Sequence, residues 1–181
     1  MVPAVSSPPT SGDHHDAIHW MSKGVGIFGM SRQIRVILLV EDSEDDADLT
    51  SRAFRKSGVN CRLVRVRDGR QALDYVFGLG EWAGRDPNLM PVLILLDLKL
   101  PCVSGLDVLR QLRQNPKGQH IPVVVMSCST EEADIVASYD LGANSYIRKP
   151  VDFVEFAGAV ELIGNYWLAL NQLPAAEGGL P

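Results

Sequence analysis

Five short apolar runs, separated by longer amphipathic stretches, dominate the chain after Arg35. The apolar runs are residues 36–40, 63–66, 92–96, 123–126 and 145–147. The amphipathic stretches are residues 44–57, 69–78, 106–115, 130–141 and 152–171. The first, third and fourth runs are apolar throughout, which is typical of parallel strands buried on both faces. Because helical crossovers allow parallel pairing, the pattern predicts an α/β fold: a doubly wound, five-stranded parallel sheet with helices on both faces.

The length of 181 residues suits one domain with tails. The first 30 residues mix proline, serine and glycine without an apolar period. We expect a flexible N-terminal tail at 1–33, a domain at 34–171 and a C-terminal tail at 172–181, with no room for an output domain. Residues 79–90 form the longest connection inside that domain, and loops of this length are often functional.

Composition excludes several classes of protein. With 46% hydrophobic and 22% charged residues, the chain is not intrinsically disordered. A formal net charge of −5 argues against direct DNA binding. The three cysteines form neither a CxxC pair nor a disulfide framework, so we expect a reducing, cytoplasmic location. We find no run of about 18 apolar residues and expect no membrane span.

Polar residues follow the predicted strands where parallel strands place ligands, at their carboxyl ends. Glu41 and Asp42 follow the first run and Asp97 follows the third, while Ser127 and Lys149 follow the fourth and fifth. Three crowded carboxylates repel one another and need a cation, and oxygen ligands suit Mg²⁺. A carboxylate beside such a metal, with a lysine and a hydroxyl nearby, can attack a phosphoryl group and hold it as an acyl phosphate. Asp97 is the candidate nucleophile.

The spacing resembles the receiver domain of two-component response regulators across residues 34–170. The matching residues are Glu41, Asp42, Asp97 with Leu-Lys-Leu-Pro after it, Gly105, Ser127, Tyr146, Lys149 and Pro150. This resemblance implies that Asp97 accepts phosphate from a histidine kinase, and that Mg²⁺ is held by Glu41, Asp42, Asp97 and the backbone carbonyl of Lys99. It also implies that Lys149 pairs with the acceptor and then with the phosphate. Such a protein signals rather than catalyses, with only slow intrinsic autophosphorylation and autodephosphorylation.

The same resemblance implies a switch. Ser127 would bind a phosphate oxygen, and the aromatic ring of Tyr146 would rotate inward on phosphorylation.

Residues 138–153 and 166–168, with the insertion at 79–90, are similar to stand-alone regulators paired with phytochrome kinases. Glu41 stands where most receivers carry aspartate, which lengthens the arm that reaches the metal. With no output domain, the signal would pass to a downstream protein or a phosphotransfer partner.

Each residue taken singly also has an ordinary interpretation. Asp42, Glu44 and Asp45 could cap the first helix, and Ser127 could cap the helix that follows it. Trp82 either anchors its own loop or meets a partner. Two other functions remain open: a degenerate receiver that binds proteins constitutively, and an aspartate-nucleophile phosphohydrolase. The phosphohydrolase usually needs a second aspartate two residues after the nucleophile, where this chain has Lys99.

The last predicted helix carries two apolar stripes. One would cover the sheet, and it contains Phe153, Phe156, Ala157, Val160, Gly164 and Trp167. The other lies roughly opposite, and it contains Leu162, Tyr166, Ala169 and Leu173. A second stripe on a surface helix predicts a contact surface, and we expect a homodimer through it. The alternatives are scattered exposed hydrophobic residues, which are common, and a contact with the kinase.

Overall fold

The computed structural model describes residues 35–172, in which five parallel strands form one sheet in the order β2-β1-β3-β4-β5. The strands are β1 (Val36–Val40), β2 (Arg62–Val66), β3 (Pro91–Leu96), β4 (Val123–Ser127) and β5 (Ser145–Arg148). This confirms the predicted five-stranded parallel sheet. The expected tail at 1–33 and all but the first residue of the expected tail at 172–181 lie outside the described residues.

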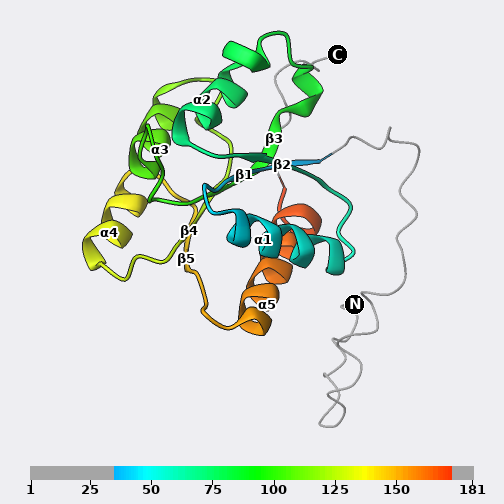
Figure 1. Ribbon diagram of the computed structural model, residues 1–181. Helices are drawn as coiled ribbons and strands as arrows, with labels where there is room; N and C mark the ends of the chain where they lie inside the picture. Colours follow the sequence, from blue (N-terminus) through cyan, green and yellow to red (C-terminus); the bar gives the residue numbers. More distant parts are fainter. Residues whose placement is uncertain (1–34, 173–181) are drawn as a thin grey trace, which may run out of the picture. The chain divides into compact units, whose positions relative to one another are not determined.

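Helices cover both faces of the sheet, as predicted. They are α1 (Glu44–Lys56), α2 (Gly69–Phe77), α3 (Gly105–Gln114), α4 (Glu132–Asp140) and α5 (Phe153–Gly164). Figure 1 shows α1 beside α5, with α2 and α3 on the opposite side of the sheet. The strand order reverses direction between β1 and β3, and an α/β sheet offers a ligand site at the carboxyl ends of the strands where this happens.

The core has two layers because β1 sends alternate side chains to opposite faces. Val36, Leu38 and Val40 pack with residues of α2 and α3, whereas Ile37 and Leu39 pack with residues of α1 and α5. All five are buried, as the uninterrupted apolar run predicts. Burial on both faces makes β1 and its neighbour β3 a rigid base for the residues that follow them.

The start of α3 packs closely under the end of β3. A Cβ atom added at Gly105 would lie 2.2 Å from the backbone oxygen of Asp97, so no side chain fits there. Ser104 caps the helix, since its hydroxyl accepts a hydrogen bond from the backbone N–H of Asp107. The glycine eight residues beyond Asp97 therefore fixes the loop that follows the candidate nucleophile.

The connection at 79–90 is ordered and contains two short 3₁₀ helices, Gly80–Trp82 and Pro87–Leu89. The ring of Trp82 packs edge-on against the ring of Tyr75, with 4.8 Å between the two centroids. The Arg85 guanidinium lies 4.7 Å from the centroid of the Tyr75 ring. The Tyr75 hydroxyl donates to the backbone oxygen of Leu89. Of the two interpretations of Trp82, the structure shows the first, in which it anchors its own loop.

The inner face of the last helix differs in part from the prediction. Phe156, Val160 and Gly164 are buried as expected, but Phe153 is half-exposed and Trp167 is only partly buried. Residues Asn165–Leu170 form a π-helix, whose wider turn shifts the later side chains around the axis. Leu168 is therefore buried in the core and Trp167 packs against it as a partly buried side chain, while Ile163 is also buried.

The outer stripe is exposed where the structure describes it. Leu162 is 72% exposed and Tyr166 is 52% exposed, and Ala169 is also exposed. Leu173, the fourth residue of the predicted stripe, lies outside the described residues. This exposure agrees with the predicted contact surface.

One helical stretch within residues 35–172 has the length and composition of a membrane span. It is Phe153–Leu170, with 18 residues and a mean hydropathy of 1.2. The stretch contains Glu155 and Glu161, so the sequence still has no run of about 18 apolar residues. The core helix of a globular domain meets the same criteria, however, and Phe156, Val160 and Ile163 of this stretch are buried in the core beside the sheet.

Candidate functional site

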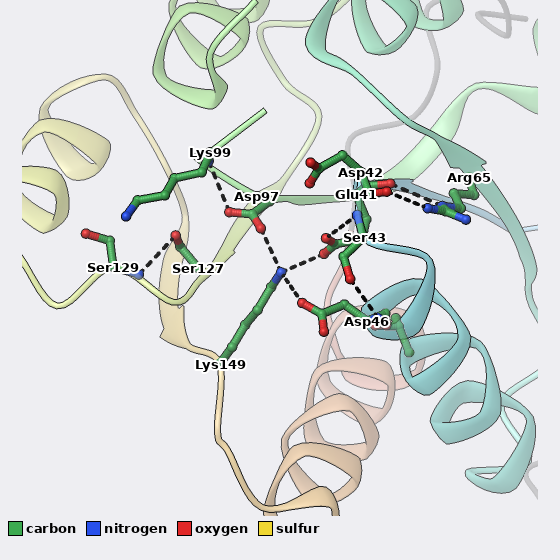
Figure 2. A network of polar contacts seen from close by, with 11 residues as sticks. Glu41, Asp42, Ser43, Asp46, Arg65, Asp97, Lys99, Ser127, Ser129 and Lys149 are labelled. Carbon is green, nitrogen blue, oxygen red and sulfur yellow. Dashed lines mark hydrogen bonds and ion pairs between the residues drawn. The ribbon is translucent and has the colours of Figure 1, made fainter. Parts of the chain in front are cut away.

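Backbone hydrogen bonds bring the predicted site residues together at the carboxyl ends of the strands. The backbone N–H of Glu41 donates to the backbone oxygen of Val66 at 3.0 Å, and that of Asp97 donates to the backbone oxygen of Val40 at 3.1 Å. The N–H of Lys149 donates to the backbone oxygen of Ser127 at 2.9 Å. These bonds extend the ladders beyond the strands, so the side chains that follow β1, β3 and β5 face one another (Figure 2).

Three carboxylates gather at this edge. Glu41, Asp42 and Asp97 each offer an oxygen, and these three oxygens lie within 4.8 Å of one another. Glu41 and Asp97 are buried, while Asp42 is exposed. Burial raises the pKa of Glu41, although the hydrogen bond from Lys149 opposes that effect. An all-oxygen donor set with excess negative charge fits a hard divalent cation such as Mg²⁺.

Lys149 supplies the positive charge at the centre of the cluster. Its side chain is 6% exposed, and its Nζ lies 2.7 Å from Glu41 Oε2 and 2.7 Å from Asp97 Oδ2. A third carboxylate, Asp46, contributes Oδ2 at 2.8 Å. Burial alone would lower the pKa of Lys149, but these three hydrogen bonds outweigh it and hold the pKa above its ordinary value.

Asp46 is a site residue that the sequence reasoning missed. It lies in the first turn of α1 beside Glu44 and Asp45, where acids ordinarily complement the helix dipole. A signal exists in the spacing: Ser43 caps α1, and Asp46 is the third residue after it, which is the position of the acid in a capping box. Here the Asp46 carboxylate binds the Lys149 ammonium instead of the backbone N–H of Ser43.

Arg65 is the second residue that was missed. It lies on β2, paired in register with Leu39 of β1. Its Nε donates to the backbone oxygen of Glu41 at 3.1 Å, and its Nη2 donates to that of Asp42 at 3.0 Å. Its Nη1 also pairs with the carboxylate of Glu44. Arg65 therefore holds the backbone that carries both acids (Figure 2), a role that an alternating strand pattern does not reveal.

The loop after β3 contacts Asp97 through its backbone. The N–H of Lys99 donates to Asp97 Oδ1 at 3.2 Å, so the two oxygens of Asp97 face different partners: a backbone amide and the Lys149 ammonium. The Lys99 residue itself is exposed. This geometry fixes the orientation of the Asp97 carboxylate before any ligand binds.

Ser127 and Tyr146 lie on either side of the loop after β4. Ser127 is fully buried, and its Oγ accepts a hydrogen bond from the N–H of Ser129 at 3.3 Å. The Tyr146 hydroxyl donates to the backbone oxygen of Ser129 at 3.1 Å, and burial raises the pKa of that hydroxyl. Ser127 does not cap α4, which begins at Glu132 without a side-chain cap. The loop thus joins the two predicted switch residues.

Comparisons with known proteins agree with this geometry. The family model of the response regulator receiver domain matches residues 37–161. The response regulator Rcp1 of Synechocystis is 39% identical over 142 residues, which is 78% of this chain and 95% of the relative. The probable methanogenesis regulatory protein FilR2 of Methanothrix harundinacea is 42% identical over 139 residues, covering 77% of this chain and 87% of that protein.

Solved structures show the same likeness. The phosphorylated cyanobacterial phytochrome response regulator RcpA is 40% identical with a TM-score of 0.73, and the match covers 78% of this chain and 99% of that one. The bacteriophytochrome response regulator RtBRR is 45% identical with a TM-score of 0.63, covering 78% of this chain and 84% of that one. The matched family model, these identities and the shared fold show that the chain belongs to the response regulator receiver domain family.

Proposed function

We propose that Asp97 is the residue on which this response regulator accepts a phosphoryl group from a histidine kinase. The observation that carries the proposal is the position of its carboxylate. Asp97 follows the central strand β3, shares an oxygen cluster with Glu41 and Asp42, and is 2.7 Å from the Lys149 ammonium. Glu41 also lies in this cluster and 2.7 Å from Lys149, but within residues 35–172 only Asp97 combines these contacts with a place at the end of the central strand β3.

The reaction is a transfer between two covalent bonds. A carboxylate oxygen of Asp97 forms a bond to phosphorus while the bond from phosphorus to the kinase histidine breaks, and the electron pair of that bond returns to the imidazole. Lys149 neutralises charge on the phosphoryl oxygens, and the Ser127 hydroxyl donates to one of them. The product is an acyl phosphate on Asp97.

Mg²⁺ is the metal we assign to the site. Its ligands would be carboxylate oxygens of Glu41, Asp42 and Asp97 and the backbone carbonyl of Lys99. The bound metal supplies positive charge that offsets the charge of the phosphoryl oxygens. Support comes from the oxygen-only donor set, and from the fact that a structure of Rcp1 is of its Mn²⁺-bound form.

Tyr146 and Ser127 form the proposed switch. Both are bonded to Ser129, through the hydroxyl of Tyr146 and the Oγ of Ser127. If the Ser127 hydroxyl turns to a phosphoryl oxygen, its bond to the Ser129 N–H changes, and the loop that holds Tyr146 changes with it. A downstream protein or phosphotransfer partner would recognise the resulting surface.

The kinase partner that we propose carries a phytochrome photosensor. The names of RcpA and RtBRR connect those relatives to phytochromes, and both match this chain at 40% identity or more. A test is phosphotransfer from a purified bacteriophytochrome kinase under red and far-red light. Phosphorylation of this chain that depends on the light condition supports the assignment. If several such kinases transfer no phosphoryl group to this chain in either light condition, that result opposes it.

We also propose a homodimer through the exposed stripe of Leu162, Tyr166 and Ala169, and a cytoplasmic location. Self-complementary pairing across a two-fold axis is the commonest arrangement for such a patch.

The three cysteines are free, which suits a reducing compartment. A signalling role is favoured over phosphohydrolysis because the position of the second catalytic aspartate holds Lys99.

The direct test of the acceptor is chemical mapping. The protein phosphorylated with acetyl phosphate and Mg²⁺ is reduced with borohydride, which converts an acyl phosphate to an alcohol, and is then digested and sequenced by mass spectrometry. We expect homoserine at position 97 alone. Homoserine at position 42 or 46 instead would assign the acceptor to a different carboxylate.

A further inference from the structure

We propose that Asp46 is a positioning residue for Lys149, holding the ammonium at the site when the metal takes the other carboxylates. This inference rests on the proposed function of the site. The resemblance assigns no role to Asp46, and Asp46 does not belong to the carboxylate cluster formed by Glu41, Asp42 and Asp97.

The three protons of the Lys149 ammonium match three acceptors. Glu41, Asp46 and Asp97 each place one carboxylate oxygen at 2.7 to 2.8 Å from Nζ (Figure 2). An ammonium has three donors and no acceptor, so the group is fully satisfied. Two of the acceptors, Glu41 and Asp97, also belong to the candidate metal site, and Asp46 alone does not.

The backbone of Asp46 is anchored on both sides. Its N–H donates to Ser43 Oγ at 3.3 Å, and its carbonyl oxygen accepts from Thr50 Oγ1 at 2.8 Å. Thr50 is buried, and Ala47 of the same turn packs in the core cluster beside the sheet. The Asp46 side chain, 32% exposed, is therefore presented to Lys149 from a rigid helix rather than from a mobile loop.

The charges explain why a third partner matters. Three carboxylates, those of Glu41, Asp46 and Asp97, bind one ammonium, and a divalent cation must compete with that ammonium for Glu41 and Asp97. Without Asp46, Lys149 would pair only with Glu41 and Asp97 and would compete with the metal more strongly. With Asp46, the ammonium keeps a partner that the metal does not need. Asp46 should therefore favour metal binding while keeping Lys149 beside Asp97.

Asp45 offers a matched control. It lies one residue away in the same first turn of α1, is exposed, and makes no ion pair within residues 35–172. Asp45→Asn and Asp46→Asn remove the same charge from nearly the same place. Any excess effect of Asp46→Asn therefore reports its contact with Lys149 and not the general loss of negative charge.

The first measurement is the Kd for Mg²⁺ of the full chain by isothermal titration calorimetry. We expect Asp46→Asn to raise this Kd about fivefold more than Asp45→Asn does, a difference typical of one charge pair. In a Lys149→Met background the excess should disappear, because Asp46 acts through the ammonium. Equal Kd values for the two single variants, or an excess that persists without Lys149, would overturn the proposal.

The second measurement needs no metal. In ¹⁵N-labelled protein with EDTA, the ammonium signal of Lys149 is identified by its loss in Lys149→Met. We expect its hydrogen exchange to be several-fold faster in Asp46→Asn and unchanged in Asp45→Asn. If the wild type binds no Mg²⁺, the metal assignment fails, and this exchange rate alone decides the role of Asp46. Unchanged exchange in Asp46→Asn would contradict that role.

Discussion

Lys149 binds Asp97 directly: the lysine Nζ and the aspartate Oδ2 lie 2.7 Å apart, and both side chains are almost completely buried. The pair joins the residue after β5 to the residue after β3, across β4. It places the proposed acceptor oxygen against a positive charge before any phosphoryl donor arrives. Truncating either partner would leave a buried charge with fewer partners, and this makes the pair central to both stability and chemistry.

Mg²⁺ should stabilise the folded protein, because a ligand that binds only the native state shifts the unfolding equilibrium. At a concentration about 100 times its Kd, the gain is about 2.7 kcal/mol, a shift of several degrees in the thermal midpoint. Asp42→Asn should reduce the shift, and Asp45→Asn serves as the control. Coincident midpoints for the wild type with and without Mg²⁺ would show that the metal site does not form.

Arg65→Met should lower the free energy of unfolding by about 1 to 3 kcal/mol, because it leaves the carbonyls of Glu41 and Asp42 without their charged donor. Arg67→Met is the matched control: Arg67 pairs with the same Glu44 carboxylate but is 63% exposed, against 20% for Arg65. That control should change stability by less than about 0.5 kcal/mol. Urea unfolding measures both variants, and equal losses would disprove the anchoring role.

Ser127→Ala should slow phosphorylation by acetyl phosphate about tenfold or more at saturating Mg²⁺, because the variant loses a donor to the phosphoryl oxygens. Its Kd for Mg²⁺ should stay near the wild-type value, since Ser127 is not part of the carboxylate cluster. Ser129→Ala is the control, because the Ser129 hydroxyl binds Asp134. The rate of adduct formation is followed by intact-mass spectrometry. Equal rates for Ser127→Ala and the wild type would remove Ser127 from the chemistry.

The double variant Leu162→Glu with Tyr166→Glu should convert a dimer to a monomer, because it places two charges in an apolar contact. Phosphorylation of Asp97 should persist, since the stripe faces away from the core. Light scattering at tens of micromolar protein measures the mass, and Val136→Glu, at an exposed apolar position on α4, is the control. A wild type that is monomeric in both phosphorylation states would end the dimer proposal and leave the stripe for another partner.

The strands and the main site residues could be predicted from the sequence for a common reason. The uninterrupted apolar runs of β1, β3 and β4 mark buried parallel strands, and parallel strands bring their carboxyl ends to one edge. Asp97 and Lys149 were therefore expected to meet, and the structure places them in contact. Burial and topology together determine this part of the site.

Asp46 and Arg65 escaped prediction because their contacts depend on side-chain reach. Asp46 looked like one more acid in a helix first turn, and its partner Lys149 lies 103 residues away in the sequence. Arg65 binds backbone oxygens, which no residue pattern records. The π-helix after Gly164 was missed for a similar reason: apolar spacing assumes a constant turn, and the wider turn buries Leu168 and leaves Trp167 only partly buried.

The most direct test of the central claim is intact-mass spectrometry after treatment with acetyl phosphate and Mg²⁺. The wild type should gain a single adduct of about 80 Da, the mass of one phosphoryl group, and lose it on brief treatment with hydroxylamine, as an acyl phosphate does. Asp97→Asn should gain none, while Asp45→Asn should behave as the wild type. A labile adduct of the same size that persists undiminished in Asp97→Asn would contradict the assignment of Asp97 as the phosphoryl acceptor.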